Sequence, residues 1–491
     1  MTTALPPGLE ARPLSGTTLE DHLKILRSLW DRYAPEATKW QQRNRGYHQA
    51  LESLARFYIP PGERILEIGS GTGDLLAALE PSEGVGIDCS EEMTRVAAQR
   101  HPHLTFHSTA AEELRLEGKT FDVIILSDLV GQLYDILAVF KKLRSVCHPG
   151  TRIVLNWYSR VWQPILGLAE ALRLKSPMPV FNWTSPEDIR NLLHLAGFRV
   201  ISQNGHLLLP KRIPLLTTLM NRFLAHAPGF RWMCLTNWVV ARPEGIDEDV
   251  RDPSVSVIVP CRNEAGNIEN VVRRMPSMGR HTEILFVEGH SKDNTLEECR
   301  RVAEKYPERD IRVLVQEGVG KGDAVRLGFS RAQGDVLMIL DADLSVAPED
   351  LPQFYETLVA RKGDFVNGSR MVYSMEERAM RFLNLVGNRG FALLLSRLMG
   401  QPVKDTLCGT KVLFRRDYER IAKGRAHFGK LDPFGDFDLL FGAAKLGLQI
   451  VEIPVRYRER VYGETNISRF RHGWLLLRMC FRALRKLVLI P

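Results

Sequence analysis

Residues 336–344 read VLMILDADL, an apolar run that ends in two carboxylates. Five consecutive apolar residues predict a buried strand, with Asp341 and Asp343 at its carboxyl end. In an open α/β sheet, ligands bind outside the carboxyl ends of the strands. Two carboxylates separated by one small residue can both face one hard cation, which usually bridges substrate phosphates. The stretch therefore predicts a site for Mg²⁺ or Mn²⁺ and a diphosphate, whereas the same pair in a solvated turn would have no such role.

The residues upstream of this stretch alternate between strand and helix patterns. Apolar runs predict strands at 255–259, 283–287 and 311–315, and a helix over 293–306. Such alternation is typical of an α/β fold built on a mostly parallel sheet.

A second α/β pattern occupies the first half of the chain. The stretch RILEIGSGTGDLL at 64–76 predicts a short strand that ends near Glu67 and leads into a helix. Three glycines lie between them, at Gly69, Gly71 and Gly73. Glycines there permit a tight turn and the close approach of a ligand to the backbone. The next strand, 84–87, ends in Asp88, where an acid can bind ribose hydroxyls.

The alternation continues to about residue 242 and predicts a doubly wound, Rossmann-like sheet. Further strands are expected at 104–107, 122–126, 152–157, 198–202 and 233–241, and helices over 134–147 and 186–196. The charged stretch at 242–253 carries two prolines and lacks periodicity, so we place the domain boundary there. The expected organisation is 1–242 for the first domain, 243–254 for the linker, 255–465 for the second domain and 466–491 for a C-terminal helix.

Composition limits the class of protein. A chain of 491 residues, with 44% hydrophobic and 25% charged residues, is too long for one core and typical of globular domains. A net charge of +8 fits an anionic ligand or a membrane surface and does not indicate nucleic acid. The seven cysteines include no Cys-x-x-Cys pair. The sequence also shows no signal peptide and no apolar run long enough to span a bilayer. These features predict a cytoplasmic protein.

Residues 60–242 resemble class I S-adenosylmethionine-dependent methyltransferases through LEIGSGTG, VGIDCSEEM, FDVIILSDL and LLHLAGFRVI. The resemblance implies that S-adenosyl-L-methionine is the cofactor, with Glu67 and the glycines around its methionine moiety and Asp88 on its ribose. It places Glu112 near the adenine. The family often has Asp at the position of Ala110, so adenine recognition departs from its pattern here. The alternative is a domain that keeps the fold and serves as a scaffold.

Residues 255–465 resemble family 2 glycosyltransferases of GT-A fold, of the polyprenyl-phosphate sugar synthase type. The resemblance is carried by VSVIVPCRNE, VEGHSKDNT, GKGDAVRLGF, LDADL, DTLCGTK and RYRERVYGETN. It implies that Asp341 and Asp343 are the metal ligands for a UDP- or GDP-linked sugar. The nucleotide and its phosphates would be bound by Pro260, Asn263, Glu264, Glu288, Lys321, Gly322 and Arg460. Where many relatives have a further Gln ligand, this chain has Ser345, so a water would complete the metal shell.

Two later acids, Asp436 and Asp438, lie at the start of a predicted helix. Asp438 matches the family's acidic position near the acceptor, where a carboxylate can take a proton from a hydroxyl. A lipid phosphate acceptor is already ionised and needs no base, so Asp438 would then orient groups instead. Asp436 would be either a catalytic group or the N-cap of the helix.

Two stretches predict peripheral contact with the inner face of a membrane. Residues 376–400 form a helical pattern whose apolar side includes Leu383, Val386 and Leu394, and the C-terminal helix gathers arginines beside bulky apolar residues. A terminal helix docked on the core with solvated arginines is the alternative.

These patterns together predict a bifunctional enzyme of glycan biosynthesis. Its metal-dependent GT-A domain would transfer a sugar with inversion from a nucleotide-sugar to a polyprenyl phosphate or another membrane-associated acceptor. Three alternatives stay open: a glycan hydroxyl as acceptor, a non-catalytic first domain, and a structural calcium site at the acidic pair.

Overall fold

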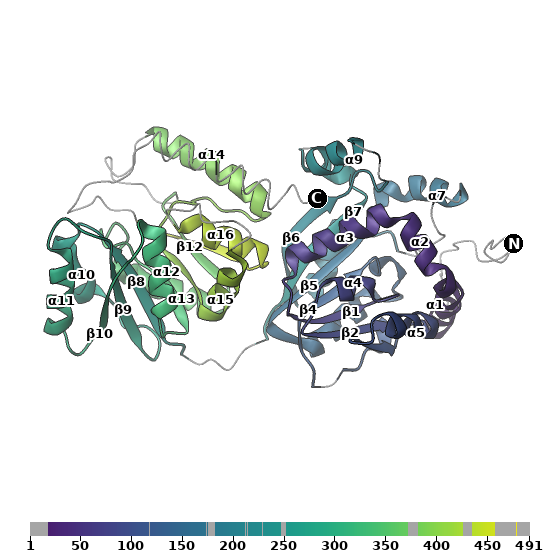
Figure 1. The fold of residues 1–491 in the computed structure, drawn as a ribbon, viewed down its shortest axis with the longest axis horizontal. Coiled ribbons are helices and arrows are strands. Elements are labelled where there is room, and N and C mark those ends of the chain that lie inside the picture. The colour runs from purple at the N-terminus through teal and green to yellow at the C-terminus, as the bar shows by residue number, and fades with distance from the viewer. Residues whose placement is uncertain are drawn as a thin grey trace. The chain divides into compact units, whose positions relative to one another are not determined.

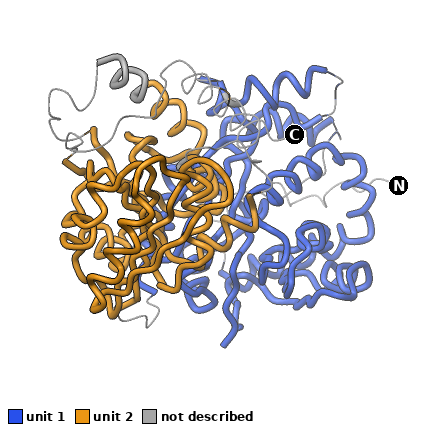
Figure 2. Tube along the Cα trace, turned by 60° about the vertical axis from the view of Figure 1, so that its left-hand side comes forward, with its two compact units in different colours: residues 1–248, 489–491 blue, residues 249–488 orange. Residues whose placement is uncertain are grey.

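The computed structural model describes residues 18–116, 118–172, 174, 182–211, 213, 215–227, 229–246, 252–371, 382–425, 435–456 and 478. For His226, 382–389 and Asp436 it describes the backbone alone. The chain divides into two compact units, with the division between residues 248 and 249 (Figures 1 and 2). Each unit is an α/β fold around one seven-stranded sheet, which confirms the predicted fold class.

The sheet of unit 1 has the order β3-β2-β1-β4-β5-β7-β6. Its strands are β1 (Arg64–Ile68), β2 (Glu83–Asp88), β3 (Thr105–Ser108), β4 (Phe121–Ser127), β5 (Cys147–Tyr158), β6 (Phe198–His206) and β7 (Thr236–Pro243). The first five pair in parallel, whereas β7 runs antiparallel to both β5 and β6. The chain order reverses between β1 and β4, which leaves a crevice at the carboxyl ends of these strands.

Helices cover this sheet: α1 (Leu19–Tyr33), α2 (Ala37–Arg43), α3 (Arg45–Tyr58), α4 (Asp74–Ala78), α5 (Glu91–Arg100), α6 (Ile136–Leu143), α7 (Gln163–Ala171), α8 (Pro186–Leu195) and α9 (Leu216–Thr218). Capping boxes at Thr18 and Ser185 begin α1 and α8, as expected where Ser or Thr is followed by an acid three residues on. Two predicted bounds are corrected. The helix expected to reach Cys147 ends at Leu143, because Arg144–Val146 tighten into a 3₁₀ turn, and the last strand begins at Thr236 instead of Met233.

The sheet of unit 2 has the order β10-β9-β8-β11-β13-β12-β14. Its strands are β8 (Val255–Cys261), β9 (Thr282–Glu288), β10 (Asp310–Val315), β11 (Val336–Ile339), β12 (Phe365–Ser369), β13 (Lys411–Phe414) and β14 (Ile450–Pro454). Strands β10, β9, β8 and β11 are parallel, and β13 is antiparallel to β11 and β12. The helices are α10 (Ala265–Arg274), α11 (Thr295–Lys305), α12 (Lys321–Arg331), α13 (Leu351–Val359), α14 (Phe382–Met399), α15 (Arg415–Gly424) and α16 (Asp436–Lys445).

Strand β11 is buried at every position, as the apolar run VLMI requires of a strand covered on both faces. It is one strand position shorter than predicted, because Leu340 leaves the ladder while staying buried. The backbone then turns, with Leu344 at a φ of +54°, so Asp341 and Asp343 lie in the loop beyond the sheet.

Candidate functional sites

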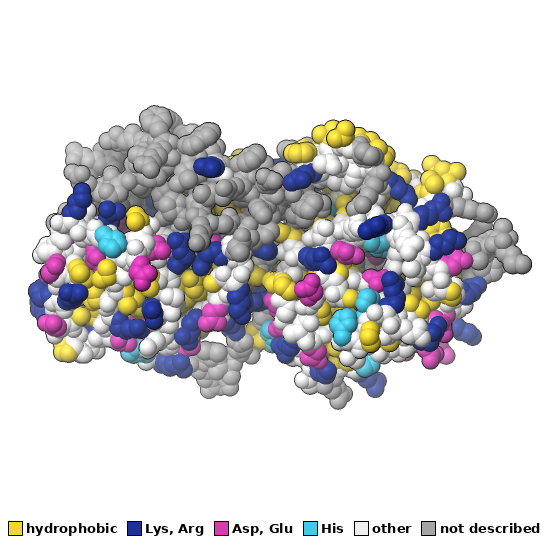
Figure 3. All heavy atoms as spheres, viewed as in Figure 1, with side chains coloured by type: hydrophobic (Ala, Val, Ile, Leu, Met, Phe, Trp, Pro, Cys, Tyr) yellow, Lys and Arg dark blue, Asp and Glu magenta, His cyan; other side chains and the backbone are white. Residues whose placement is uncertain are grey.

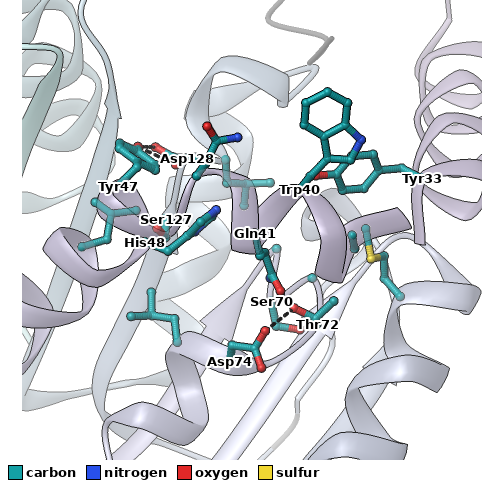
Figure 4. Close-up of a pocket in the computed structure, with 18 of the residues that line it drawn as sticks. Tyr33, Trp40, Gln41, Tyr47, His48, Ser70, Thr72, Asp74, Ser127 and Asp128 are labelled. Atoms are coloured by element: carbon teal, nitrogen blue, oxygen red, sulfur yellow. Dashed lines mark hydrogen bonds between the residues drawn. The ribbon is translucent and has the colours of Figure 1, made fainter. Parts of the chain in front are cut away.

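A cavity of about 1370 Å³ lies in unit 1 beside the carboxyl ends of β1, β2 and β4. Its walls include Glu67, the glycine loop, Asp88 and Glu112, together with residues of the N-terminal helices α1 to α3 (Figure 4). Pockets for a single small molecule usually measure about 300–1,000 Å³. The cavity is therefore large enough for a cofactor and an acceptor group together.

The glycine loop after β1 has the backbone that the sequence predicts. Gly69, Gly71 and Gly73 all have positive φ angles, between +51° and +74°, which favours glycine. A side chain at Gly73 would overlap Phe106, whereas open space surrounds the missing side chain of Gly71. The loop therefore presents bare backbone where a ligand can approach closely.

Asp88 anchors this loop from the end of β2. One carboxylate oxygen accepts a hydrogen bond from the Gly71 amide at 2.9 Å, and the other accepts one from the Ser90 amide at 2.9 Å. Burial raises the pKa of Asp88, and the two backbone hydrogen bonds offset part of that rise. Each carboxylate oxygen has a second lone pair, so Asp88 fits the predicted contact with ribose hydroxyls.

Glu67 is the most unusual carboxyl of the cavity. It is 2% exposed, and its Oε2 atom accepts no hydrogen bond from the residues that the structure describes. Burial, with a smaller contribution from the charge of Asp88, raises its pKa to about 8. A buried acceptor that lacks a partner is costly unless a ligand supplies one. Glu67 therefore fits a cationic or hydrogen-bonding group of a bound molecule.

Glu112 also lines the cavity, next to the buried Ala110. Its Oε1 atom accepts a hydrogen bond from the Tyr134 amide at 2.9 Å, and its backbone carbonyl accepts one from Lys142. The carboxylate is thus held in place at the cavity wall, where the resemblance puts the adenine.

A polar cluster that the sequence analysis missed lies across the cavity at the end of β4 (Figure 4). Tyr47 of α3 donates its hydroxyl to Asp128 at 2.7 Å, and Asn156 donates its amide to the same carboxylate at 2.7 Å. Burial raises the pKa of Tyr47 and Tyr158 well above 10, so both phenols stay protonated at neutral pH. Asp128 has a φ of +53°, a conformation in which non-glycine residues are uncommon and worth a functional explanation.

His48 lies next to this cluster on α3 and lines the cavity (Figure 4). Burial lowers its pKa below the usual 6.5, and the charge of Asp74 opposes only part of the effect. The imidazole is therefore neutral at pH 7 and able to accept a proton.

Hydrogen bonds fix the N-terminal helices over the cavity. Gln41 donates to the Thr72 hydroxyl at 2.7 Å, and Trp30 donates to the Gln132 side chain at 3.0 Å. At the other end of α3, the buried Arg152 donates to the Tyr58 carbonyl at 2.7 Å. The predicted helical region before β1 is thus part of the site.

In unit 2, Lys321 and Asp341 meet at the carboxyl end of β11. The Lys321 ammonium lies 2.5 Å from Asp341 Oδ1, and both side chains are about a quarter to a third exposed. A side chain at Gly409 would overlap both groups, so the DTLCGTK motif packs directly against the pair. Three of the predicted motifs therefore converge on one point.

Asp343 is 6% exposed and accepts a hydrogen bond from the Ser345 amide at 3.0 Å on Oδ1. Among the described residues, no group of three or more His, Cys, Asp or Glu side chains lies close enough together to hold a metal ion with protein ligands alone. Two carboxylates with water and substrate phosphates suit Mg²⁺ or Mn²⁺, which do not need an all-protein cage. The acidic pair fits such an ion and fits a structural calcium site less well.

The predicted nucleotide residues follow two neighbouring strands, β8 and β9. The Asn263 side chain accepts from the Lys292 amide at 2.7 Å, and Glu288 Oε1 accepts from the Ser291 amide at 2.6 Å. Glu264 accepts from the Asn267 side chain at 2.7 Å. The Lys292–Asn263 bond joins the turn after Pro260 to the turn after β9, and the other two bonds are local to one turn each.

Gln316, at the end of β10, was missed from the sequence. It is 3% exposed, and its side-chain carbonyl oxygen accepts no hydrogen bond within the described part of the chain. The buried Gln316 amide lies beside Gly289 and is a candidate for hydrogen bonding to the polar edge of a ligand. The signal was a polar residue directly after an apolar strand.

Asp438 lies in α16 and is 8% exposed. Its carboxylate accepts a hydrogen bond from Arg425 Nε at 2.5 Å, and the two form an ion pair. Directly before α16, a side chain at Gly435 would overlap the backbone of Gly322, so the start of this helix lies against the start of α12. The Asp436 side chain and Arg460 lie outside the described residues.

The predicted membrane segments fall largely outside the described residues. Helix α14 covers part of the stretch 376–400, and its exposed residues include Leu393 and Leu394. The side chains of Leu383 and Val386 are not described, and of 466–491 only Arg478 is. Within the described ranges, no helix is both long and apolar enough to cross a bilayer.

Comparison with known proteins gives one family match in each half of the chain. Residues 256–421 match the family model described as glycosyl transferase family 2, and residues 40–203 match that of a methyltransferase domain. An undecaprenyl-phosphate 4-deoxy-4-formamido-L-arabinose transferase from Edwardsiella ictaluri is 29% identical over 220 residues, which are 43% of this chain and 62% of that protein. A dolichol-phosphate mannosyltransferase from Pyrococcus furiosus is 30% identical over 221 residues, which are 44% of this chain and 59% of that protein.

The chain thus spans about 60% of the length of the two curated relatives. A solved structure of a SAM-dependent methyltransferase from Thermotoga maritima aligns with a TM-score of 0.36 and 18% identity, covering 44% of this chain and 98% of that one. The two family matches lie in the order that the sequence motifs predict.

Proposed function

We propose that this chain, which carries a methyltransferase domain followed by a glycosyl transferase family 2 domain, is a bifunctional enzyme that modifies a membrane-linked glycan intermediate. The second domain transfers a sugar from a UDP- or GDP-sugar to a polyprenyl phosphate. The first transfers a methyl group from S-adenosyl-L-methionine. The convergence of Lys321, Asp341 and Gly409 on one point is the observation that carries the glycosyltransferase assignment.

For sugar transfer, Asp341 and Asp343 would hold Mg²⁺ or Mn²⁺, which would supply positive charge for the leaving diphosphate. In the structure, the Lys321 ammonium forms an ion pair with Asp341 at 2.5 Å. When donor and cation bind, Lys321 would exchange Asp341 for a diphosphate oxygen. The turns after β8 and β9, with Glu288 and Gln316, bind the nucleoside.

The ion pair of Asp438 supports a phosphate acceptor over a sugar hydroxyl. One oxygen of this carboxylate already accepts a hydrogen bond from Arg425 Nε at 2.5 Å, so it is engaged in an ion pair instead of being open to an acceptor hydroxyl. A lipid phosphate needs no base, and Arg425 beside it would contribute positive charge. The relatives named for undecaprenyl-phosphate and dolichol-phosphate transfer favour the same acceptor class.

For methyl transfer, Glu67 and the glycine loop bind the methionine end of the cofactor, Asp88 its ribose, and Glu112 the region of the adenine. Alignment of donor and acceptor supplies most of the rate enhancement. If the acceptor is a hydroxyl, His48 takes its proton while the new O–CH₃ bond forms and the S–CH₃ bond breaks. Tyr47 and Asp128 position the acceptor beside it.

A donor screen on the full chain tests the glycosyltransferase assignment. Thermal unfolding is followed with UDP- and GDP-sugars, with and without Mn²⁺. A ligand at a hundredfold excess over its Kd stabilises a folded protein by about 2.7 kcal/mol, so one nucleotide class should raise the Tm when Mn²⁺ is present. If no donor raises the Tm in the presence of Mn²⁺, the assignment is wrong.

A further inference from the structure

Unit 1 exposes an extensive apolar face. Most of the large apolar side chains that are exposed in the described part of the chain lie in two segments, 161–174 and 213–233. Leu168 and Leu172 at α7 are 62% and 60% exposed, and Leu215, Leu219 and Trp232 are 88%, 58% and 63% exposed. Figure 3 shows hydrophobic atoms gathered over α7 and α9. A soluble surface rarely exposes so many large apolar groups together unless they bind something.

The two segments form one face because the sheet brings them together. One follows β5, and the other connects β6 to β7, so both emerge at the carboxyl edge of the sheet. The Trp162 indole donates to the Met233 carbonyl at 2.7 Å and joins them. We call the exposed apolar side chains of 161–174 and 213–233 the apolar face.

The apolar face adjoins the cofactor cavity. Ile165, Leu166 and Leu174 of the first segment line the cavity, as do Leu209 and Lys211 just before the second. Helix α7 therefore borders the cavity with Leu166, which is buried, while Leu168 and Leu172 point to solvent. A molecule bound at the apolar face has a direct route to the methyl donor.

The positive charge of the stretch 207–235, which contains the second segment, indicates the kind of surface that the apolar face fits. Residues 207–235 contain Lys211, Arg212, Arg222 and Arg231 and no Asp or Glu. Exposed Phe223, Phe230 and Trp232 accompany them. Basic residues beside aromatic and aliphatic ones are typical of segments that lie in the headgroup layer of an anionic membrane.

We propose that the apolar face docks unit 1 on an anionic lipid bilayer, and that the methyl acceptor is a lipid-linked molecule whose head enters the cavity from that face. This identification of the acceptor rests on the proposed methyltransferase function, whereas the docking itself does not. The face consists of residues other than those of the membrane segments predicted at 376–400 and 466–491.

Vesicle co-sedimentation of the full chain tests the docking. The triple variant Leu168→Glu, Leu219→Glu, Trp232→Glu places three carboxylates on the apolar face without altering a cavity residue. Leu195→Glu is the matched control, because Leu195 is 56% exposed on α8, outside the face. Vesicles of phosphatidylcholine with phosphatidylglycerol should bind the triple variant about tenfold or more weakly than the wild type and the control. Equal binding of all three proteins would overturn the proposal.

Calorimetric titration with S-adenosyl-L-methionine separates misfolding and loss of the proposed function from loss of docking. The triple variant should bind the cofactor as the wild type does. If the wild type itself binds no cofactor, the methyltransferase function fails while the vesicle result still decides the docking. Concentration-dependent dimerisation of the wild type that the triple variant abolishes, without vesicle binding, would assign the face to a second copy and overturn the proposal.

The acceptor class is tested with methyl-labelled S-adenosyl-L-methionine and membranes of the source cells. Label should enter the organic extract, and the triple variant should transfer about tenfold less than the Leu195→Glu control. Label that enters only water-soluble glycans, or equal transfer by both variants, would show that the acceptor is not lipid-linked.

Discussion

We predict that the affinity for S-adenosyl-L-methionine depends on pH through the ionisation of Glu67. With a pKa of about 8, the buried carboxyl is protonated in about nine of ten free molecules at pH 7. The methionine end of S-adenosyl-L-methionine carries positive charge, which favours the ionised form of a carboxyl beside it. Binding should therefore release about 0.9 proton at pH 7. Ionising Glu67 at pH 7 costs about 1.4 kcal/mol, which lowers the affinity for S-adenosyl-L-methionine about tenfold.

Isothermal titration in buffers of different ionisation enthalpy measures the released protons directly. The affinity should rise about tenfold per pH unit between pH 6 and 7 and level off above pH 8. Glu67→Gln should remove both the proton release and the pH dependence. Glu52→Gln, which alters another carboxyl of the cavity wall, should change neither.

The same raised pKa makes the free energy of unfolding of the free protein depend on pH. Because folding raises the pKa of Glu67, its contribution to stability is present below pH 4.5 and is lost as the pH rises through about 8. The free protein should lose stability over this range, and Glu67→Gln should lose less. Proton release by the wild type that is zero, or that persists in Glu67→Gln, would refute the reasoning.

Three further predictions concern both units. Because burial lowers the pKa of His48, methyl transfer to a hydroxyl at saturating S-adenosyl-L-methionine should fall only at a pH below the ordinary titration range of histidine. His48→Gln should slow transfer about 10²–10⁴-fold and abolish that acidic limb, as initial rates would show. With a polyprenyl phosphate acceptor, Asp438→Asn should keep the rate of sugar transfer within about tenfold of the wild type. The reason is that Asp438, paired with Arg425, orients neighbouring groups and does not accept a proton from the acceptor. A loss of rate near 10³-fold would show that Asp438 acts as a base. Arg370→Met should lower the free energy of unfolding of unit 2 by about 3–5 kcal/mol in denaturant titration, because it leaves Asp405 buried without its ion pair, and a change below about 1 kcal/mol would contradict this.

The parallel strands and the glycine loop could be predicted from local sequence. Buried parallel strands are short apolar runs, and acidic residues at or just beyond their carboxyl ends mark a ligand edge, as with Glu67, Asp88 and Asp341. The loop glycines were recognisable because all three have positive φ angles, a backbone conformation that favours glycine. Such signals lie within a few residues of each other and need no knowledge of the rest of the chain.

Contacts between distant segments could not be predicted. Tyr47 and Asp128 are 81 residues apart in sequence and meet only because α3 folds over the end of β4. The antiparallel direction of β7 and β13 also depends on how the sheet is completed, since the strand pattern is the same in either direction. The apolar face at 161–174 and 213–233 was missed because each segment alone resembles an ordinary core-facing helix.

The central claim is that Asp341 and Asp343 hold a cation on the leaving diphosphate of a sugar nucleotide. The most direct test compares Mn²⁺-dependent donor binding and sugar transfer by the wild type and by the double variant Asp341→Ala, Asp343→Ala, with S-adenosyl-L-methionine binding as the control for folding. We expect the double variant to lose metal-dependent donor binding and at least about 10³-fold in transfer, while cofactor binding by unit 1 is unchanged. Donor binding and transfer that keep their metal dependence in the double variant would contradict the account.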